Sequence, residues 1–169
     1  MTVDSFKFLP RLIAMFYRMT EREPLLPIPW TPLDRPLSEC KFGLVTSGGL
    51  FLRDSEPPFD VVRERENPTW GDPSYRVIPV DVQTSAVSVS HLHYNNSDVE
   101  ADFNILLPIH RFHTLVEEGQ VGGMAESHYS FMGYQGFPAD TTEWEDRYGP
   151  AVAEAFLNEG VNCVLLTPA

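Results

Sequence analysis

The chain has 169 residues, 43% of them hydrophobic, with 11 Phe, 6 Tyr and 3 Trp, which is enough to bury one globular core. Its formal net charge of −12 argues against a nucleic-acid partner or an anionic membrane, because both bind clustered Lys and Arg. No run of about 20 apolar residues could span a bilayer, and the N-terminus lacks the layout of a signal peptide. Cys40 and Cys163 form neither a metal-binding spacing nor a disulfide framework, so we expect a cytoplasmic protein.

The N-terminal part of the chain separates from the rest by composition. Apolar residues recur at helical spacing from Ser5 to Met19 and predict an amphipathic helix. Five prolines between residues 24 and 36 then exclude regular structure and predict an extended arm. We expect residues 1–36 to form this helix and arm, which either dock on their own domain or clasp another subunit, and residues 37–169 to form an α/β domain.

The first predicted strand is Lys41 to Thr46, a short apolar run typical of a central parallel strand. It ends in Ser47, Gly48 and Gly49, and ligands of open α/β sheets bind beyond such strand ends. This loop matches neither a P-loop nor a dinucleotide fingerprint, so its glycines indicate a tight turn. Residues 53–73 show no periodicity and predict an ordered excursion or a flexible loop. Tyr75 to Val80 predicts a second strand, which Pro79 stops or bulges.

The stretch from Val87 to Asp98 is the densest in usable chemistry. Val87 and Val89 alternate with serines, as in a half-buried strand, and His91 and His93 follow at the strand end. Residues i and i+2 of an extended segment point to the same side, so the two imidazoles could face one small volume. That geometry would allow joint metal ligation or joint proton handling.

The remaining elements alternate between helix and strand. Pro108 to Glu118 predicts a helix, Val121 to Tyr134 an extended segment, and Val161 to Leu166 a final strand. A last helix begins at Thr141 or Thr142, and Pro150 predicts that it is kinked or divided into two pieces. The fold class predicted from this order is α/β, a single domain with a mostly parallel sheet flanked by helices.

Several phrases of the sequence together resemble one family, the selenoprotein B family of glycine, sarcosine and betaine reductases, which includes D-proline reductase. The resemblance covers nearly the whole chain from about Pro29 and rests on Pro29–Asp34, Pro36–Cys40, Gly71–Pro79, Ser90–Tyr94, His128–Tyr134 and Leu165–Pro168. It implies an α/β subunit in which a selenocysteine or cysteine attacks a small amino acid or amine substrate and a second thiol resolves the product. In that family the redox residue follows a strand that resembles Val164–Pro168, so we expect it just after Ala169; the alternative is that this protein does without the thiol.

The resemblance and the strand-end pattern together suggest the site. His91, His93, His128 and Tyr129 are the expected catalytic residues, with the histidines handling protons or holding a carboxylate. The expected substrate-binding residues are Ser47, Gly48, Tyr134 and Thr167. The expected partners are a small-molecule substrate and either a partner reductase subunit or further copies of the chain. Neither cysteine is an expected nucleophile, since Cys163 lies in an apolar run and Cys40 begins a strand.

A metal-centred site is the alternative function. His91, His93 and His128, with help from Asp98 or Asp102, would supply three protein ligands and leave an open position for zinc or iron. Histidines that only make structural hydrogen bonds are the simplest explanation of the same three residues.

Overall fold

The structure is a computed structural model that describes residues 10–12, 15 and 31–169. The chain divides into two compact units, Met1–Asp34 and Arg35–Ala169, and everything below concerns the second unit. The expected N-terminal helix and most of the proline-rich arm lie outside the described residues. The elements of the second unit are β1 (Lys41–Thr46), β2 (Leu50–Leu52), α2 (Val61–Glu66), β3 (Tyr75–Pro79), β4 (Val87–Val89), α3 (Ser97–Ala101), α4 (Ile109–Glu117), β5 (Gly123–Met124), β6 (Ser127–Phe131), η5 (Trp144–Tyr148), α5 (Gly149–Asn158) and β7 (Cys163–Thr167), with short 3-10 turns at Leu37–Glu39, Thr84–Ala86 and Phe103–Ile105.

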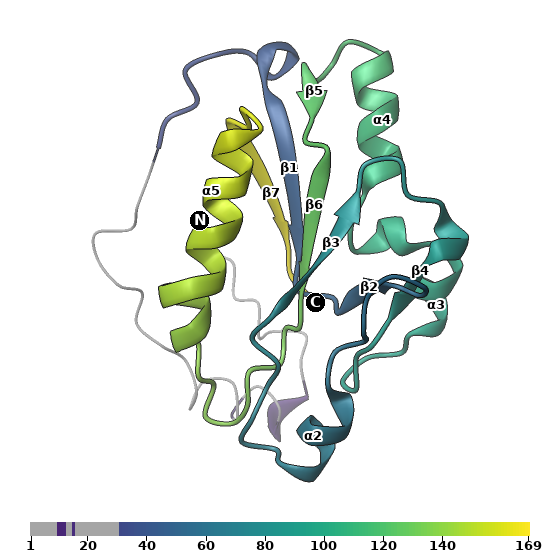
Figure 1. Cartoon of the computed structure of the whole chain (residues 1–169), viewed down its shortest axis with the longest axis vertical. Coiled ribbons are helices and arrows are strands. Elements are labelled where there is room, and N and C mark those ends of the chain that lie inside the picture. The colour runs from purple at the N-terminus through teal and green to yellow at the C-terminus, as the bar shows by residue number, and fades with distance from the viewer. Residues whose placement is uncertain (1–9, 13–14, 16–30) are drawn as a thin grey trace. The chain divides into compact units, whose positions relative to one another are not determined.

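The main sheet is built around β1, as its apolar sequence predicts. β5 pairs with the start of β1, β6 with its end and β7 along most of its length, all in parallel. β3 adds to the outer edge of β6 and is the antiparallel member of the sheet. Figure 1 shows β7 on one side of β1, with β5 and β6 following one another on the other side. The prediction of an α/β fold with a mostly parallel sheet is confirmed.

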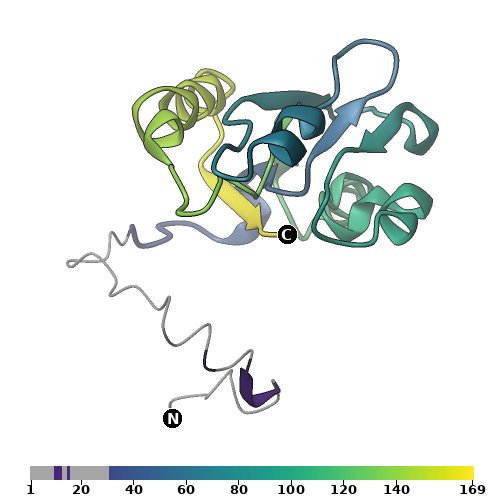
Figure 2. The same ribbon diagram turned by 90° about the horizontal axis from the view of Figure 1, so that it is seen from below.

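Helices cover both faces of this sheet. α5 lies on one face and α4 on the other, as Figures 1 and 2 show from two directions. The α5 face holds a core cluster that includes Phe156, Tyr129 and Val45. The α4 face holds the larger cluster, in which Leu44 and Ile109 are fully buried. Neighbouring β1 residues Leu44 and Val45 thus pack into opposite cores, which is why the middle of the strand is continuously apolar rather than alternating.

A separate two-stranded ladder lies beyond the carboxyl end of β1. β2 and β4 pair antiparallel, with Leu50 opposite Val89 and Leu52 opposite Val87. The predicted strand at Val87 is therefore confirmed, but it lies outside the main sheet. This ladder brings Ser90 next to the turn after β1, where the Ser90 N–H donates to the Gly49 carbonyl.

The prediction for residues 53–73 was wrong in one respect, because α2 forms within this stretch. Asp60 caps the helix by accepting from the Arg63 N–H at 2.9 Å. The sequence gives no sign of this helix, because it is short and charged and its one buried residue is Glu64, so it shows no apolar periodicity. The division of the last helix is confirmed, since the π-helical η5 runs into α5 with Pro150 in its first turn. No helix in the described part of the chain is long and apolar enough to cross a membrane.

Candidate functional site

The turn after β1 gathers the carboxyl ends of the central strands. The Ser47 N–H donates to the Thr167 carbonyl at 3.2 Å, and the Gly49 N–H donates to the Phe131 carbonyl at 2.8 Å. Gly49 has φ +68°, and a Cβ there would stand 2.6 Å from the Ser90 carbonyl oxygen, so the tight turn predicted from its glycines requires this one. The turn therefore joins β1, β6 and β7 at one edge of the sheet.

The last residue of the chain lies on this turn. The Ala169 N–H donates to the Ser47 hydroxyl at 3.0 Å. Gly133 is packed between the two, since a Cβ added there would be 2.9 Å from the Ala169 oxygen and 3.0 Å from the Ser47 oxygen. Gly133 immediately precedes Tyr134. Ala169 thus lies at the carboxyl edge of the sheet, against the glycine that precedes Tyr134.

The loop after β4 is tied to the same turn by Tyr94. The Tyr94 hydroxyl donates to the Gly48 carbonyl at 2.5 Å, and its ring packs on His91 with centroids 4.2 Å apart. Burial raises the pKa of Tyr94, so this hydroxyl keeps its proton and remains a donor. His91 is therefore anchored beside the turn, as the strand-end pattern suggests.

His91 is held as a neutral hydrogen-bond donor. Its Nδ1 accepts from the His93 N–H at 3.1 Å, which leaves the ring proton on Nε2. Burial, followed by the nearby His93, lowers the pKa of His91 to about 4. Its Nε2 is buried and has no hydrogen-bond partner among the described residues, and the same is true of the Asn96 Oδ1 in this loop. A buried donor without an acceptor is costly, so the position suits a bound polar group or water.

His93 combines an exposed ring with a buried carboxylate. Its Nε2 lies 2.7 Å from the Glu64 Oε1, and the side chains of His93 and Glu64 are 48% and 3% exposed. The Tyr134 ring lies against His93, with centroids 4.4 Å apart and planes at 32°. The His91 and His93 rings meet edge to face at 5.6 Å, so the expected juxtaposition of the two histidines is present. The backbone between them bends rather than continuing the strand.

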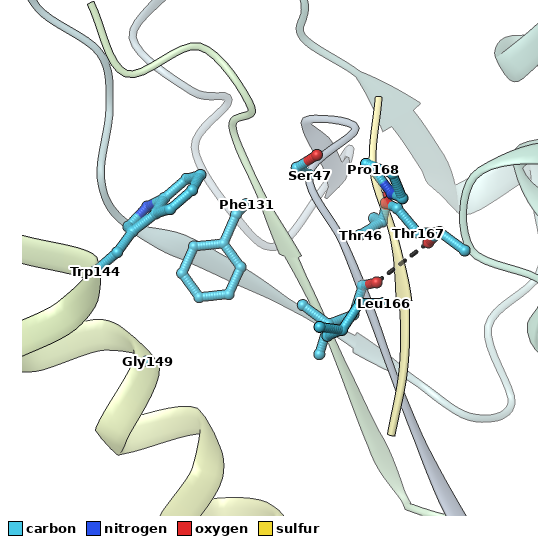
Figure 3. Close-up of a pocket in the computed structure, with 9 residues that line it drawn as sticks. Thr46, Ser47, Phe131, Trp144, Gly149, Leu166, Thr167 and Pro168 are labelled. Atoms are coloured by element: carbon cyan, nitrogen blue, oxygen red, sulfur yellow. Dashed lines mark hydrogen bonds between the residues drawn. The ribbon is translucent and has the colours of Figure 1, made fainter. Parts of the chain in front are cut away.

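An apolar pocket of about 650 Å³ opens at the α5 side of the same edge. Figure 3 shows Trp144 and Phe131 on one side of it and Leu166 on the other, with Ser47 and Pro168 also at its wall. Thr167 lines the pocket, but its hydroxyl already faces the backbone carbonyls of Val45 and Leu106.

The other two predicted catalytic residues lie on β6 and contact the core. His128 is fully buried, and its Nδ1 accepts from the Leu44 N–H at 3.2 Å. Burial lowers the pKa of His128 to about 4, and His113 adds to this effect. Tyr129 packs edge to face on Phe156 in the α5 core, and burial raises its pKa. The structure brings Ser47, Gly48, His91, His93 and Tyr134 together, whereas His128 and Tyr129 make their contacts within the two cores.

The expected metal ligands do not form a shared site within the described part of the chain. Across residues 10–12, 15 and 31–169, no three or more His, Cys, Asp or Glu side chains are grouped as a metal ion would need. His128 lies on β6 and accepts from Leu44 of β1, while His91 and His93 belong to the loop after β4. Asp102 accepts from Asn104 and pairs with Arg111 instead, and these groups lower its pKa.

The two cysteines are free thiols that pack in one cluster, with Cys40 just before β1 and Cys163 at the start of β7. Cys40 is fully buried, and Cys163 is partly buried in register with Phe42. Burial and then the neighbouring Cys40 raise the pKa of Cys163, which keeps it a protonated, weakly nucleophilic thiol.

Two residues of this region were not found from the sequence. Glu64 lies in a charged stretch with no apolar periodicity, so nothing there marks it as buried. Trp144, which lines the pocket, lies at the start of η5, and π-helical turns are frequent at functional sites. A one-turn π-helix has no signature in a single sequence, although the strong helix breaker Pro150 shows that the geometry changes nearby.

Comparison with known families assigns the chain to one of them. The family model described as glycine/sarcosine/betaine reductase selenoprotein B matches residues 17–169. The protein therefore belongs to this family of reductase selenoproteins, as its sequence phrases suggest.

Among individual proteins, the chain is similar to the D-proline reductase subunit gamma of Acetoanaerobium sticklandii. The two are 35% identical over 145 residues, which is 85% of this chain and 55% of the relative. The chain thus spans about half the length of the curated relative it matches. No solved structure matches the chain.

Proposed function

We propose that this chain is a subunit, or part of a subunit, of a selenol- or thiol-dependent reductase that acts on a small amino acid or a related amine. The family assignment and the similarity to a D-proline reductase subunit support the reaction class. One observation carries the proposal further: Ala169 bonds to Ser47 on the turn that also holds Tyr94 and His91. A redox selenocysteine or cysteine just after Ala169 would begin at this edge of the sheet.

The chemistry requires a nucleophile and a proton source. The selenolate or thiolate attacks the substrate carbon, forms a Se–C or S–C bond and breaks the C–N bond, while the leaving nitrogen takes up a proton. A second thiolate then attacks the selenium or sulfur, the carbon takes up a proton, and a selenenylsulfide or disulfide remains. An external dithiol reduces that bond and completes the cycle.

The imidazoles suit the two protein roles in this scheme. His91 stays neutral well below pH 7, and its Nε2–H has no hydrogen-bond partner within residues 31–169, so it would hold a substrate oxygen by a hydrogen bond. His93 is half exposed and hydrogen-bonded to a carboxylate, so it would exchange the proton. His128 and Tyr129 would act from the core by fixing β6 against β1. Because the relative is named as a subunit, we propose that this chain also binds a partner reductase subunit. A cytoplasmic location and a homo-oligomeric assembly are further parts of the proposal.

The experiment uses the native gene product, including any residue encoded after Ala169. Its mass and selenium content are measured first, and then its turnover of D-proline, glycine, sarcosine and betaine with a dithiol as reductant. We expect a selenium- or thiol-dependent activity on one of these compounds. Replacement of the redox residue by serine should abolish that activity, and His93→Gln should lower it, while the exposed-site control Glu66→Gln leaves it unchanged. A product without selenium or a further cysteine, and without turnover, would refute the proposal.

A further inference from the structure

Helix α2 buries an unexpected side chain. Among its six residues, Val61–Glu66, Glu64 is the buried one, whereas Val62 is 63% exposed. An ordinary short surface helix does the reverse and packs its valines inward. The structure thus places a carboxylate where an apolar side chain would be the cheaper choice.

A buried carboxylate loses its hydration, and this loss must be offset by partners. The described partner of Glu64 is the Nε2 atom of His93, at 2.7 Å. Asp60 fixes α2 from its N-terminus by accepting from Arg63, and the Asp60 N–H donates to Asp72 at 3.1 Å. Glu64 is therefore delivered to His93 by a helix that is itself tied down.

The ring of His93 is fixed on several sides. The Glu64 carboxylate accepts a hydrogen bond from the His93 Nε2–H. Tyr134 covers one face of the ring, and the edge contact with His91 restricts its rotation. Nδ1 makes no hydrogen bond to any residue in the described ranges, and the side chain is 48% exposed. An ionised carboxylate can only accept, so it keeps a proton on Nε2 and leaves Nδ1 as the atom that can gain or lose one.

We propose that Glu64 is a positioning residue that holds the His93 ring so that its Nδ1 atom exchanges the proton used at this edge of the sheet. This inference rests on the proposed reductase function and adds to it a residue that no other observation assigns. The arrangement is a carboxylate–imidazole pair in which the carboxylate orients the ring and fixes its tautomer. Tyr134 contributes the packing that keeps the ring plane fixed.

Two measurements test this inference. The first is ¹⁵N NMR of the imidazole groups at neutral pH, on the full chain without substrate. We expect a His93 Nε2–H signal protected from solvent exchange, and we expect Glu64→Leu to abolish it. The second is steady-state turnover, in which Glu64→Leu should lower kcat on the order of ten-fold or more with little change in KM, because proton transfer rather than binding is affected. Glu64→Gln, which can still accept through its amide oxygen, should retain part of the His93 Nε2–H signal and part of kcat.

The matched control is Glu66→Leu, the same change at an exposed position of the same helix. It should leave both the NMR signal and kcat as they are. A His93 Nε2–H signal that is absent, or that survives in Glu64→Leu, would overturn the pairing. A signal that is lost while kcat stays unchanged would overturn the positioning role. If the native protein itself has no turnover, the reductase proposal fails and this role fails with it, whereas the NMR result still reports whether the pair exists.

Discussion

Tyr94 and Gly48 are joined across 46 residues of sequence by a hydrogen bond of 2.5 Å from the phenol to the backbone carbonyl. Through this bond, the loop that carries both histidines is attached to the turn at the carboxyl end of β1. Tyr94 also packs on the ring of His91. Tyr94 therefore adds a side-chain link between the loop after β4 and the edge of the main sheet, next to the backbone bond from Ser90 to Gly49.

Removing the hydroxyl in Tyr94→Phe should lower the free energy of unfolding by about 1 kcal/mol, because the Gly48 carbonyl loses its donor. Chemical denaturation measures this change. Tyr148→Phe is the control, since the Tyr148 hydroxyl has no hydrogen bond within the described chain while its ring contacts Tyr75. Equal stability of the two variants would show that the Tyr94 bond does not hold the loop.

Stability should fall between about pH 6.5 and about pH 4 because of His91 and His128. Both have folded-state pKa values lowered from 6.5 to about 4 by burial, so in this range the unfolded chain binds protons that the folded chain does not. The free energy of unfolding therefore decreases as the pH falls from about 6.5 and stops responding to these groups below about 4.

The size of this effect is testable by urea unfolding at several pH values. Each histidine should contribute about 1 kcal/mol or more at the acidic end of the range, because one pKa unit corresponds to about 1.4 kcal/mol. His128→Gln should make the curve shallower than that of the native chain. An unchanged slope in this variant would mean that His128 titrates equally in the folded and unfolded states.

Substituting Gly71→Ala should disturb the site from a distance. An added Cβ would collide with the Tyr134 carbonyl oxygen and crowd Gln135, and neither backbone segment can yield easily. We expect a loss of about 1–3 kcal/mol in the free energy of unfolding, together with a changed ring-current shift at His93 as Tyr134 moves. Gly123→Ala is the matched control, because its nearest neighbour is the flexible Lys41 side chain at 3.9 Å. Similar effects of the two substitutions would argue against tight packing at Gly71.

Replacing His93 by Phe should destabilise the fold although an aromatic ring is kept against Tyr134. The Glu64 carboxylate would stay buried without its partner, and leaving such a group unpaired costs about 1–3 kcal/mol. The double variant Glu64→Leu with His93→Phe should regain most of that stability, because the unpaired charge is gone. Thermal or denaturant unfolding of the native chain, of Glu64→Leu, of His93→Phe and of the double variant measures the coupling free energy between the two positions. A coupling near zero would contradict the pairing.

Much of the fold follows from local patterns. The apolar run Lys41–Thr46 coincides with β1, and the apolar periodicity after Pro108 coincides with α4. Pro150 divides the last helix as expected, and Gly160, with φ +74°, follows its end. These features depend on neighbours within a few residues, where apolar spacing and the geometry of proline and glycine decide the backbone.

The partners of the histidines depend on contacts between distant segments. His91 and His93 do lie together, but the sequence alone also grouped them with His128, which β6 places against Leu44 in the core. Glu64 gave no signal, because its partner is 29 residues away and its helix has no apolar stripe.

The sequence by itself thus determined the strands β1, β3, β4, β6 and β7, the helices α4 and α5, the mostly parallel sheet, the family, and the stretch in which His91 and His93 lie. Only the tertiary structure decided which side chains meet there, that a buried carboxylate holds His93, and that Ala169 ends beside Ser47. The physical reason is that secondary structure is set by the short-range periodicity of apolar and backbone-restricting residues. A polar site, in contrast, is assembled by packing, and packing alone determines which buried donor finds which acceptor.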